Sequence, residues 1–323
     1  MKKNITLLKK PKLKNTFFIA AWPGMGDVAL KAATFLKDKL KAEEFAVFKS
    51  EDFFQPQGVE IQNQIITTAK IPEGKFYFYK SKLLKNDLII FISEAQPLLE
   101  KSYEYAKQII SFIKEFDVEM VFTFAALPSP IEHNKKPGVW AVATHKELLE
   151  KLKQLPLQFM PTGQISGLNG LILGVSGEFN IPGICLLGEI PFYTIQIENP
   201  LSSLAVLRVL TKIINVRIEY AELEEHAHLI SQEIEKFMDF LKDPESQEKP
   251  IGSDEIEKIK ESLSAYTKIP ESVKKKIEQL FEEARRDISQ ASELKKELDH
   301  WSIYKEYEDR FLDLFRKPGK KNN

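Results

Sequence analysis

The stretch TFFIAAWPGMGDVALKAATFLKDKL, residues 16–40, joins a short apolar run to an amphipathic segment through a turn that contains two glycines. Residues 16–22 are apolar and aromatic, which is typical of a buried strand. The segment Asp27–Leu40 repeats apolar residues at three- and four-residue steps, which predicts a helix. A strand that passes directly into a helix indicates an α/β protein.

The alternation of strand and helix continues to about residue 214. Further strands are predicted at 45–48, 75–79, 87–92, 118–125 and 184–187, and further helices at 97–116, 145–155 and 200–214. The run Asp87–Ile92 is apolar on both faces, which suits a strand covered by helices on two sides. We therefore expect a three-layer α/β/α sandwich with a mostly parallel sheet, in which segments 59–70 and 76–80 could form an antiparallel edge.

Composition and charge narrow the functional classes. The 323 residues are 43% apolar, and 46 Lys and Arg against 47 Asp and Glu give a net charge of −1, so no overall basic field attracts nucleic acid or anionic lipid. The single cysteine, Cys185, lies in an apolar run and is expected to be a buried thiol without a disulfide. Neither a signal peptide nor a run of about 18 uncharged apolar residues is present, which predicts a cytoplasmic protein without a membrane span.

Four parts are predicted along the chain. They are a basic arm with six lysines (1–15), an α/β domain with closing helices (16–242), a linker (243–253) and a helical C-terminal extension (254–323). Asn199 and Pro200 are expected to cap the last helix of the α/β layers. In the extension, Pro270–Asp299 carries an apolar stripe that predicts either a small helical bundle or self-association as a coiled coil.

The W-P-G-M-G-D turn of residues 22–27 lies at the first strand-to-helix junction. Glycines there allow the backbone to approach an anion, toward which free helix N–H groups point. The spacing matches neither a dinucleotide-binding loop nor a P-loop, so nucleotide binding has no specific support. Trp22, Gly24, Met25 and Gly26 are therefore ligand-binding candidates, with a tight structural turn as the alternative.

The loop at 162–174 opens the densest glycine region of the chain, with seven glycines between residues 163 and 188. Such density indicates either a loop that wraps a ligand or backbone packed closely on a neighbouring element. Asn169 and Gly170 are candidates for the first interpretation. In the second, Asn169 caps the helix that follows.

Polar residues follow two of the predicted buried strands. Glu94 and Gln96 come after 87–93, and Glu189 comes after 184–188. Carboxylates at strand ends near one crevice could serve as acid and base, or each could cap a helix. We expect Gly24, Gly26, Asn169, Gly170 and Glu189 to converge at one end of the sheet.

Metal, cofactor and nucleophilic chemistry lack support in the sequence. The five histidines are scattered, and the pair at 226 and 228 cannot share a helix face, so no metal site is expected. No G-x-S-x-G motif is present, and Cys185 lies inside a predicted strand, which argues against a hydrolase. No catalytic residue and no cofactor is predicted.

These motifs, in this order, resemble the proteasome-assembly-chaperone type-two family from about residue 15 to 230. The matching segments are W-P-G-M-G at 22–26, F-F-Q-P at 53–56, E-A-Q-P at 94–97, G-Q-I-S-G-L-N-G at 163–170 and C-L-L-G-E-I-P at 185–191. The resemblance implies a nucleoside-phosphorylase-like α/β/α fold. In characterised relatives it also implies oligomers that help to build or cap proteasome cores. Where relatives have a glycine-rich strand end, this chain has A-A-L-P-S-P at 125–130.

The resemblance favours a non-enzymatic assembly chaperone or interaction protein. The alternatives are an enzyme or small-molecule binder that uses the crevice, and a structural partner that acts through the C-terminal helices. A homo-oligomer is expected, with a trimer favoured, and the apolar run Phe76–Tyr79 would suit its buried face.

Proteasome-like core subunits are possible partners by the same resemblance. Relatives that dock through their C-terminus end in an apolar residue, a tyrosine and one more residue. Residues 316–323 are instead rich in cations and amides, so docking through this tail is not expected. Phe311 and Phe315, in the helix predicted at 302–315, should be packed down rather than offered to a partner.

Overall fold

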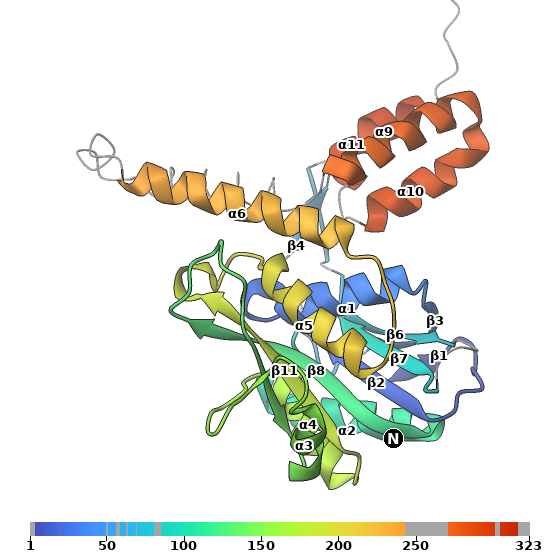
Figure 1. The fold of residues 1–323 in the computed structure, drawn as a ribbon. Coiled ribbons are helices and arrows are strands. Elements are labelled where there is room, and N and C mark those ends of the chain that lie inside the picture. Colours follow the sequence, from blue (N-terminus) through green and yellow to red (C-terminus); the bar gives the residue numbers. More distant parts are fainter. Residues whose placement is uncertain are drawn as a thin grey trace, which may run out of the picture. The chain divides into compact units, whose positions relative to one another are not determined.

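A computed structural model describes residues 4–49, 51–55, 59–62, 64–68, 70–80, 85–242, 271–300 and 304–315. The chain divides into two compact units, Met1–Tyr220 and Ala221–Asn323, which are treated in turn (Figure 1). The linker predicted at 243–253, the helix expected at 254–266 and the tail 316–323 lie outside the described residues.

The first unit is built on a nine-stranded sheet with the order β1-β3-β6-β7-β2-β8-β11-β9-β10. Its strands are β1 (Ile5–Leu7), β2 (Thr16–Ala21), β3 (Glu43–Lys49), β6 (Glu73–Tyr79), β7 (Leu88–Ser93), β8 (Val118–Ser129), β9 (Val139–Ala143), β10 (Gln158–Phe159) and β11 (Gly183–Pro191).

The sheet is mixed, which corrects the prediction of a mostly parallel one. Strands β7, β2, β8 and β11 are parallel neighbours. Strands β1, β3 and β6 extend this centre antiparallel on one side, and β9 pairs antiparallel with β11 on the other. The segment 80–87 between β6 and β7 is shorter than the dozen or so residues that a parallel crossover needs, so the chain turns straight back.

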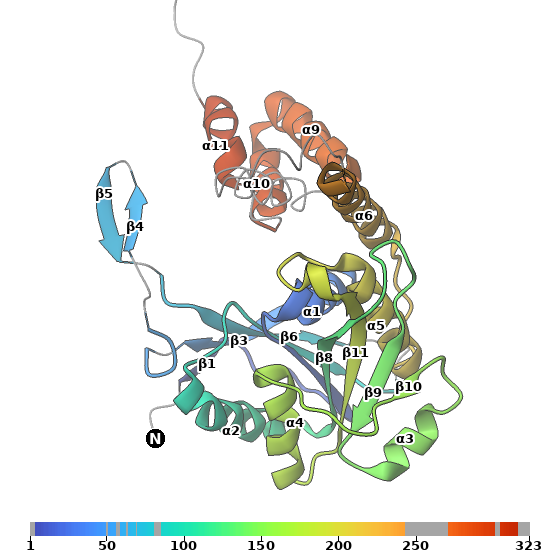
Figure 2. The same ribbon diagram turned by 90° about the vertical axis from the view of Figure 1, so that its left-hand side faces the viewer.

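Helices cover both faces of the sheet, as the apolar strands predict. Figure 2 shows α1 (Val28–Lys39) and α5 (Pro200–Ile213) on one face and α2 (Ser102–Ile113) and α4 (Leu168–Glu178) on the other. Helix α3 (Lys146–Leu152) follows β9. The predicted cap of α5 is confirmed, because the Asn199 side chain accepts a hydrogen bond from the Ser202 backbone N–H and proline follows it.

An aromatic core fills the space between the sheet and α2. The ring of Phe76 lies 4.5 Å from that of Phe91, and Trp22 lies 5.3 Å from Phe91. Phe76 is fully buried, and β6 lies between β3 and β7 rather than at an edge. The run Phe76–Tyr79 therefore contributes to the interior through Phe76, which corrects its assignment to the sheet edge. Residues 77–79 are half-buried, and a role for this run in an oligomer face stays a prediction. Cys185 is buried and free, as predicted.

Strands β4 (Val59–Gln62) and β5 (Ile65–Thr68) form a separate two-stranded antiparallel sheet. The segment 59–70 is thus a hairpin rather than an edge of the main sheet (Figure 2). Part of the basic arm is ordered as β1, the edge strand of the main sheet, which pairs with β3.

In its described residues, the second unit contains helices α6 (Ala221–Lys242), α9 (Glu271–Arg286), α10 (Ala291–His300) and α11 (Tyr304–Asp313). The apolar stripe predicted across 270–299 is broken at Asp287, whose carboxylate accepts a hydrogen bond from the Ser289 backbone N–H at 3.0 Å. Helices α9, α10 and α11 share a buried apolar cluster, which agrees with the small helical bundle predicted from the sequence. Its members are Ile277, Leu280, Phe281, Ala284, Ala291, Leu294, Leu298 and Phe311.

Phe311 is packed down as expected, but Phe315 is 55% exposed, because it follows the last turn of α11. In the described ranges, no helix combines the length and hydropathy needed to span a bilayer.

Candidate functional site

A pocket of about 340 Å³ lies where the central parallel strands end. Three segments line it: the turn after β2 (Pro23–Met25), the end of β8 (Ala125–Pro128) and the loop that leads into α4 (Gln164–Asn169). The carboxyl edge of the parallel strands is where open α/β sheets bind ligands. Of the predicted site residues, Gly24, Met25, Gln96 and Asn169 line this pocket.

Asn169 clamps the end of β2. Its Oδ1 accepts a hydrogen bond from the Trp22 backbone N–H at 3.0 Å, and its Nδ2 donates to the Trp22 carbonyl at 3.1 Å. Both residues are buried, so each of these groups needs a protein partner. Asn169 therefore joins α4 to β2 rather than capping its own helix, whose N-cap residue is Gly167.

Gln96 makes a second bridge over the same turn. Its Nε2 donates to the Pro23 carbonyl at 2.7 Å, and its Oε1 accepts from the Leu168 backbone N–H at 3.1 Å. The Leu168 N–H is one of the donors that a helix start leaves without an intrahelical acceptor. The amides of Asn169 and Gln96 thus both bond to backbone, and their arrangement fixes the shape of the pocket.

The two glycines of the turn have different surroundings. Gly24 faces the pocket, and a Cβ added there would lie 3.6 Å from Asn169 Nδ2. Gly26 has φ 59° and bonds through its N–H to the Ile195 carbonyl at 2.9 Å. Gly26 is required by its left-handed backbone and packs on the segment before α5, so it does not share the pocket with Gly24.

The two strand-end carboxylates lie apart. Glu94 accepts a hydrogen bond from the Glu73 backbone N–H at 3.0 Å. Glu189 accepts from the Gly138 N–H at 2.8 Å and from Trp140 Nε1 at 3.0 Å. Strands β2 and β8 lie between β7 and β11, which separates their ends by about 14 Å at the usual strand spacing. The geometry does not make an acid–base pair of them, and neither carboxylate lines the pocket.

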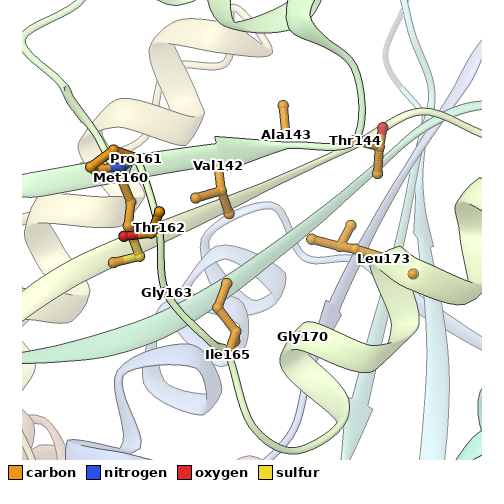
Figure 3. A pocket seen from close by; sticks show the side chains of 11 residues that line it. Val142, Ala143, Thr144, Met160, Pro161, Thr162, Gly163, Ile165, Gly170 and Leu173 are labelled. Atoms are coloured by element: carbon orange, nitrogen blue, oxygen red, sulfur yellow. The ribbon is translucent and has the colours of Figure 1, made fainter.

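A second cavity of about 420 Å³ lies beside the loop that leads into α4, where Gly170 is placed (Figure 3). Met160 and Ile165 line both this cavity and the first pocket. A Cβ on Gly170 would meet the Ile165 carbonyl at 2.4 Å, so this glycine packs against the loop. All five residues predicted to converge lie at the carboxyl end of the central strands, but only Gly24 and Asn169 of them line the pocket.

Sequence reasoning missed several residues that line the pocket, chiefly the apolar Met160 and Ile165 and the amide Gln164. Gly163 and Gly167 indicated a loop in the sequence. Side chains that only shape a pocket follow no sequence motif, so they could not be predicted. None of the residues that line the pocket is charged. Within the described ranges, no group of three or more His, Cys, Asp or Glu residues could hold a metal ion.

Charged groups gather behind the turn instead. Lys31 of α1 forms an ion pair with Glu198, and Asp27 lies one helical turn before it. Burial raises the pKa of the Asp27 carboxyl, while a hydrogen bond to the Gly24 backbone and the charge of Lys31 oppose this shift. Asp27, Lys31 and Glu198 thus lie beside the contact between Gly26 and the segment before α5. Their charges act on the turn and do not line the pocket.

The model of the PAC2 family matches residues 18–238 of this chain. The chain belongs to the PAC2 family. The resemblance to proteasome assembly chaperones seen in the sequence is thereby confirmed, and helices α9, α10 and α11 lie beyond the matched residues.

Relatives of known sequence or structure agree with the PAC2 assignment. The uncharacterized protein MJ1210 of Methanocaldococcus jannaschii is 30% identical over 251 residues, which are 76% of this chain and 93% of MJ1210. PbaB of Pyrococcus furiosus, described as an archaeal proteasome activator, is 28% identical with a TM-score of 0.63 over 74% of this chain and 98% of PbaB. PbaA of the same organism, an archaeal homolog of proteasome-assembly chaperone, shares the fold at 24% identity with a TM-score of 0.57, over 74% of this chain and 93% of PbaA.

Proposed function

We propose that this PAC2 protein is a non-enzymatic chaperone or interaction protein that binds proteasome-like core subunits and works as a homo-oligomer, with a trimer as the favoured state. The observation that carries the proposal is the character of the pocket at the end of the central strands. Its two polar anchors, Asn169 and Gln96, bond to backbone groups of the protein itself.

An enzyme of this fold would need ionisable or nucleophilic groups that converge on a substrate. Here the lining is uncharged, and the nearest strand-end carboxylates bond to backbone and indole N–H groups on separate strands. A surface held rigid by such bonds suits protein recognition, in which preorganised shape lowers the cost of binding. The description of PbaB as a proteasome activator supplies the class of partner.

The test is to mix the purified full chain with an archaeal-type proteasome core particle. We expect the two to co-elute in gel filtration and the core to gain activity against protein substrates. A chain cut after Phe315 should bind equally, because residues 316–323 contain no large apolar side chain that could anchor a contact. Separate elution of the full chain at micromolar concentration of both partners would contradict the proposal. Loss of binding in the cut chain alone would assign the contact to the tail.

A second candidate function is binding of a small nucleoside-like or phosphate-bearing molecule. The pocket volume of about 340 Å³ lies in the range of small-molecule sites, and the N-terminal backbone of α4 borders it. Gly24→Val would fill the pocket without straining the backbone, because Gly24 has an extended φ of −169°. Thermal stabilisation by nucleosides or phosphate that Gly24→Val abolishes and Gly177→Ala keeps would favour this function over the first.

A further inference from the structure

The β4–β5 hairpin lies apart from the main sheet (Figure 2) and carries exposed aliphatic side chains. Ile61 pairs across the hairpin with Ile66, and the two are 69% and 67% exposed. Val59, two residues before Ile61, lies on the same face and is also exposed. These three side chains form an aliphatic strip on one face of a sheet that has only two strands.

A two-stranded sheet is marginal on its own. Hairpins become independently stable in water when three or more strands share an apolar face, or when another element packs on that face. Strands β4 and β5 pair with each other and with none of the nine strands of the main sheet. Each therefore presents one free edge of backbone N–H and C=O groups, which is a template for another strand.

The two free edges differ in charge. Strand β4 contains Glu60, whereas β5, with the sequence I-I-T-T at 65–68, contains no charged residue and no proline. Natural edges are usually protected by such residues. A charged residue in its sequence disfavours pairing along the β4 edge, whereas pairing of β5 with β5 brings no charged residues together.

We infer that β5 pairs antiparallel with β5 of a second copy of this chain across a two-fold axis. The result is a four-stranded sheet in the order β4-β5-β5-β4, with the strips of Val59, Ile61 and Ile66 merged into one apolar face. Such a contact is self-complementary, as a two-fold interface requires. Combined with the three-fold contact proposed for the PAC2 domain, it gives a six-chain assembly. The inference does not depend on proteasome binding.

Lysine substitutions at the paired positions Ile66 and Ile61 test this geometry. In the four-stranded sheet, residues at position 66 of the two copies lie on adjacent strands about 5 Å apart, and those at position 61 lie three spacings, or about 14 Å, apart. At 0.15 M salt the screening length is about 8 Å. Ile66→Lys should weaken self-association at least tenfold, and Ile61→Lys, matched in exposure and face, less than threefold.

The measurement is sedimentation equilibrium of the full chain and both variants at 0.15 M and 1 M salt. The unmodified chain should form an even multiple of its 37.1 kDa mass, Ile66→Lys should halve that assembly, and 1 M salt should partly restore it. A monomer, an assembly of odd number, or equal loss in both variants would overturn the inference. Equal urea midpoints for the three dissociated chains would show that the lysines leave the fold intact.

Discussion

Asn169 holds the end of β2 to the start of α4 through both atoms of its amide. Asn169→Ala would leave the buried N–H and C=O of Trp22 without partners. Each unsatisfied group costs about 1–3 kcal/mol, so the free energy of unfolding should fall by about 2–4 kcal/mol. Urea denaturation followed by tryptophan fluorescence measures the change.

Gln164→Ala is the matched control for Asn169→Ala. Gln164 is an amide that lines the same pocket but is exposed, and its loss should change the free energy of unfolding by less than about 0.5 kcal/mol. Equal urea midpoints for Asn169→Ala and the unmodified chain would show that the amide clamp contributes nothing.

Cys185 is fully buried in β11, and burial raises the pKa of its thiol to about 12. A neutral, inaccessible thiol does not react, so a thiol reagent at pH 8 should label the chain only at the rate at which the protein unfolds. Mass spectrometry across a urea series measures this rate. Fast labelling without urea would contradict the burial.

The same thiol gives a pH dependence with a defined sign. Because the folded pKa lies above the ordinary value of 9.0, its contribution to stability is complete below about pH 9 and is lost as the pH rises toward 12. From pH 8 to pH 10, the unmodified chain should lose about 1 kcal/mol more unfolding free energy than Cys185→Ala. Equal losses in the two chains would show that the thiol titrates normally.

At the scale of elements, helix α4 contains two glycines four residues apart whose surroundings differ. At Gly170 a Cβ would lie 2.4 Å from the Ile165 carbonyl, whereas at Gly174 it would meet no atom within 4 Å. Gly174→Ala should therefore raise the free energy of unfolding by about 0.5–1 kcal/mol, because alanine favours the helix. Gly170→Ala should lower it by about 1–3 kcal/mol through overpacking. Thermal denaturation of both variants gives the two signs, and a shared sign would contradict the packing of α4.

The sequence predicted best those elements that are set by local chemistry. The strand predicted at 87–92 is found as Leu88–Ser93, and the helix cap predicted at Asn199 is also confirmed. Whether neighbouring strands run parallel or antiparallel was harder to predict. It depends on whether the connection between them is long enough for a crossover, and the segment 80–87 between β6 and β7 is too short.

The candidate site was predicted only in part for a similar reason. Glycine and asparagine are typical of loops, and on this basis Gly24 and Asn169 were both predicted as site residues. Both line the same pocket. Glu189 was expected to follow its strand but lies within β11. Its bonds to Gly138 and Trp140 depend on β9 pairing antiparallel with β11, which no motif in the sequence indicates.

At the scale of the whole molecule, the described residues of each compact unit include a hydrophobic cluster that is separate from the other, namely the aromatic core beside α2 and the cluster of α9, α10 and α11. Separate cores can unfold in separate cooperative steps, so calorimetry should show two transitions. Leu294→Ala removes a fully buried side chain from the cluster of α9, α10 and α11 and should destabilise that unit by about 2–5 kcal/mol. Leu186→Ala does the same to β11 in the first unit. Leu294→Ala should lower the transition temperature of its unit by about 10 °C or more, and Leu186→Ala that of the first unit by about 4–20 °C. Each variant should leave the other transition within about 2 °C. A single transition that both variants shift equally would show that the units fold as one.

If two transitions are found, binding of the Leu294→Ala variant to the core particle separates the roles of the units. The binding is measured at a temperature between the two transitions. Retained binding assigns the contact to the PAC2 domain, and lost binding assigns it to the helices.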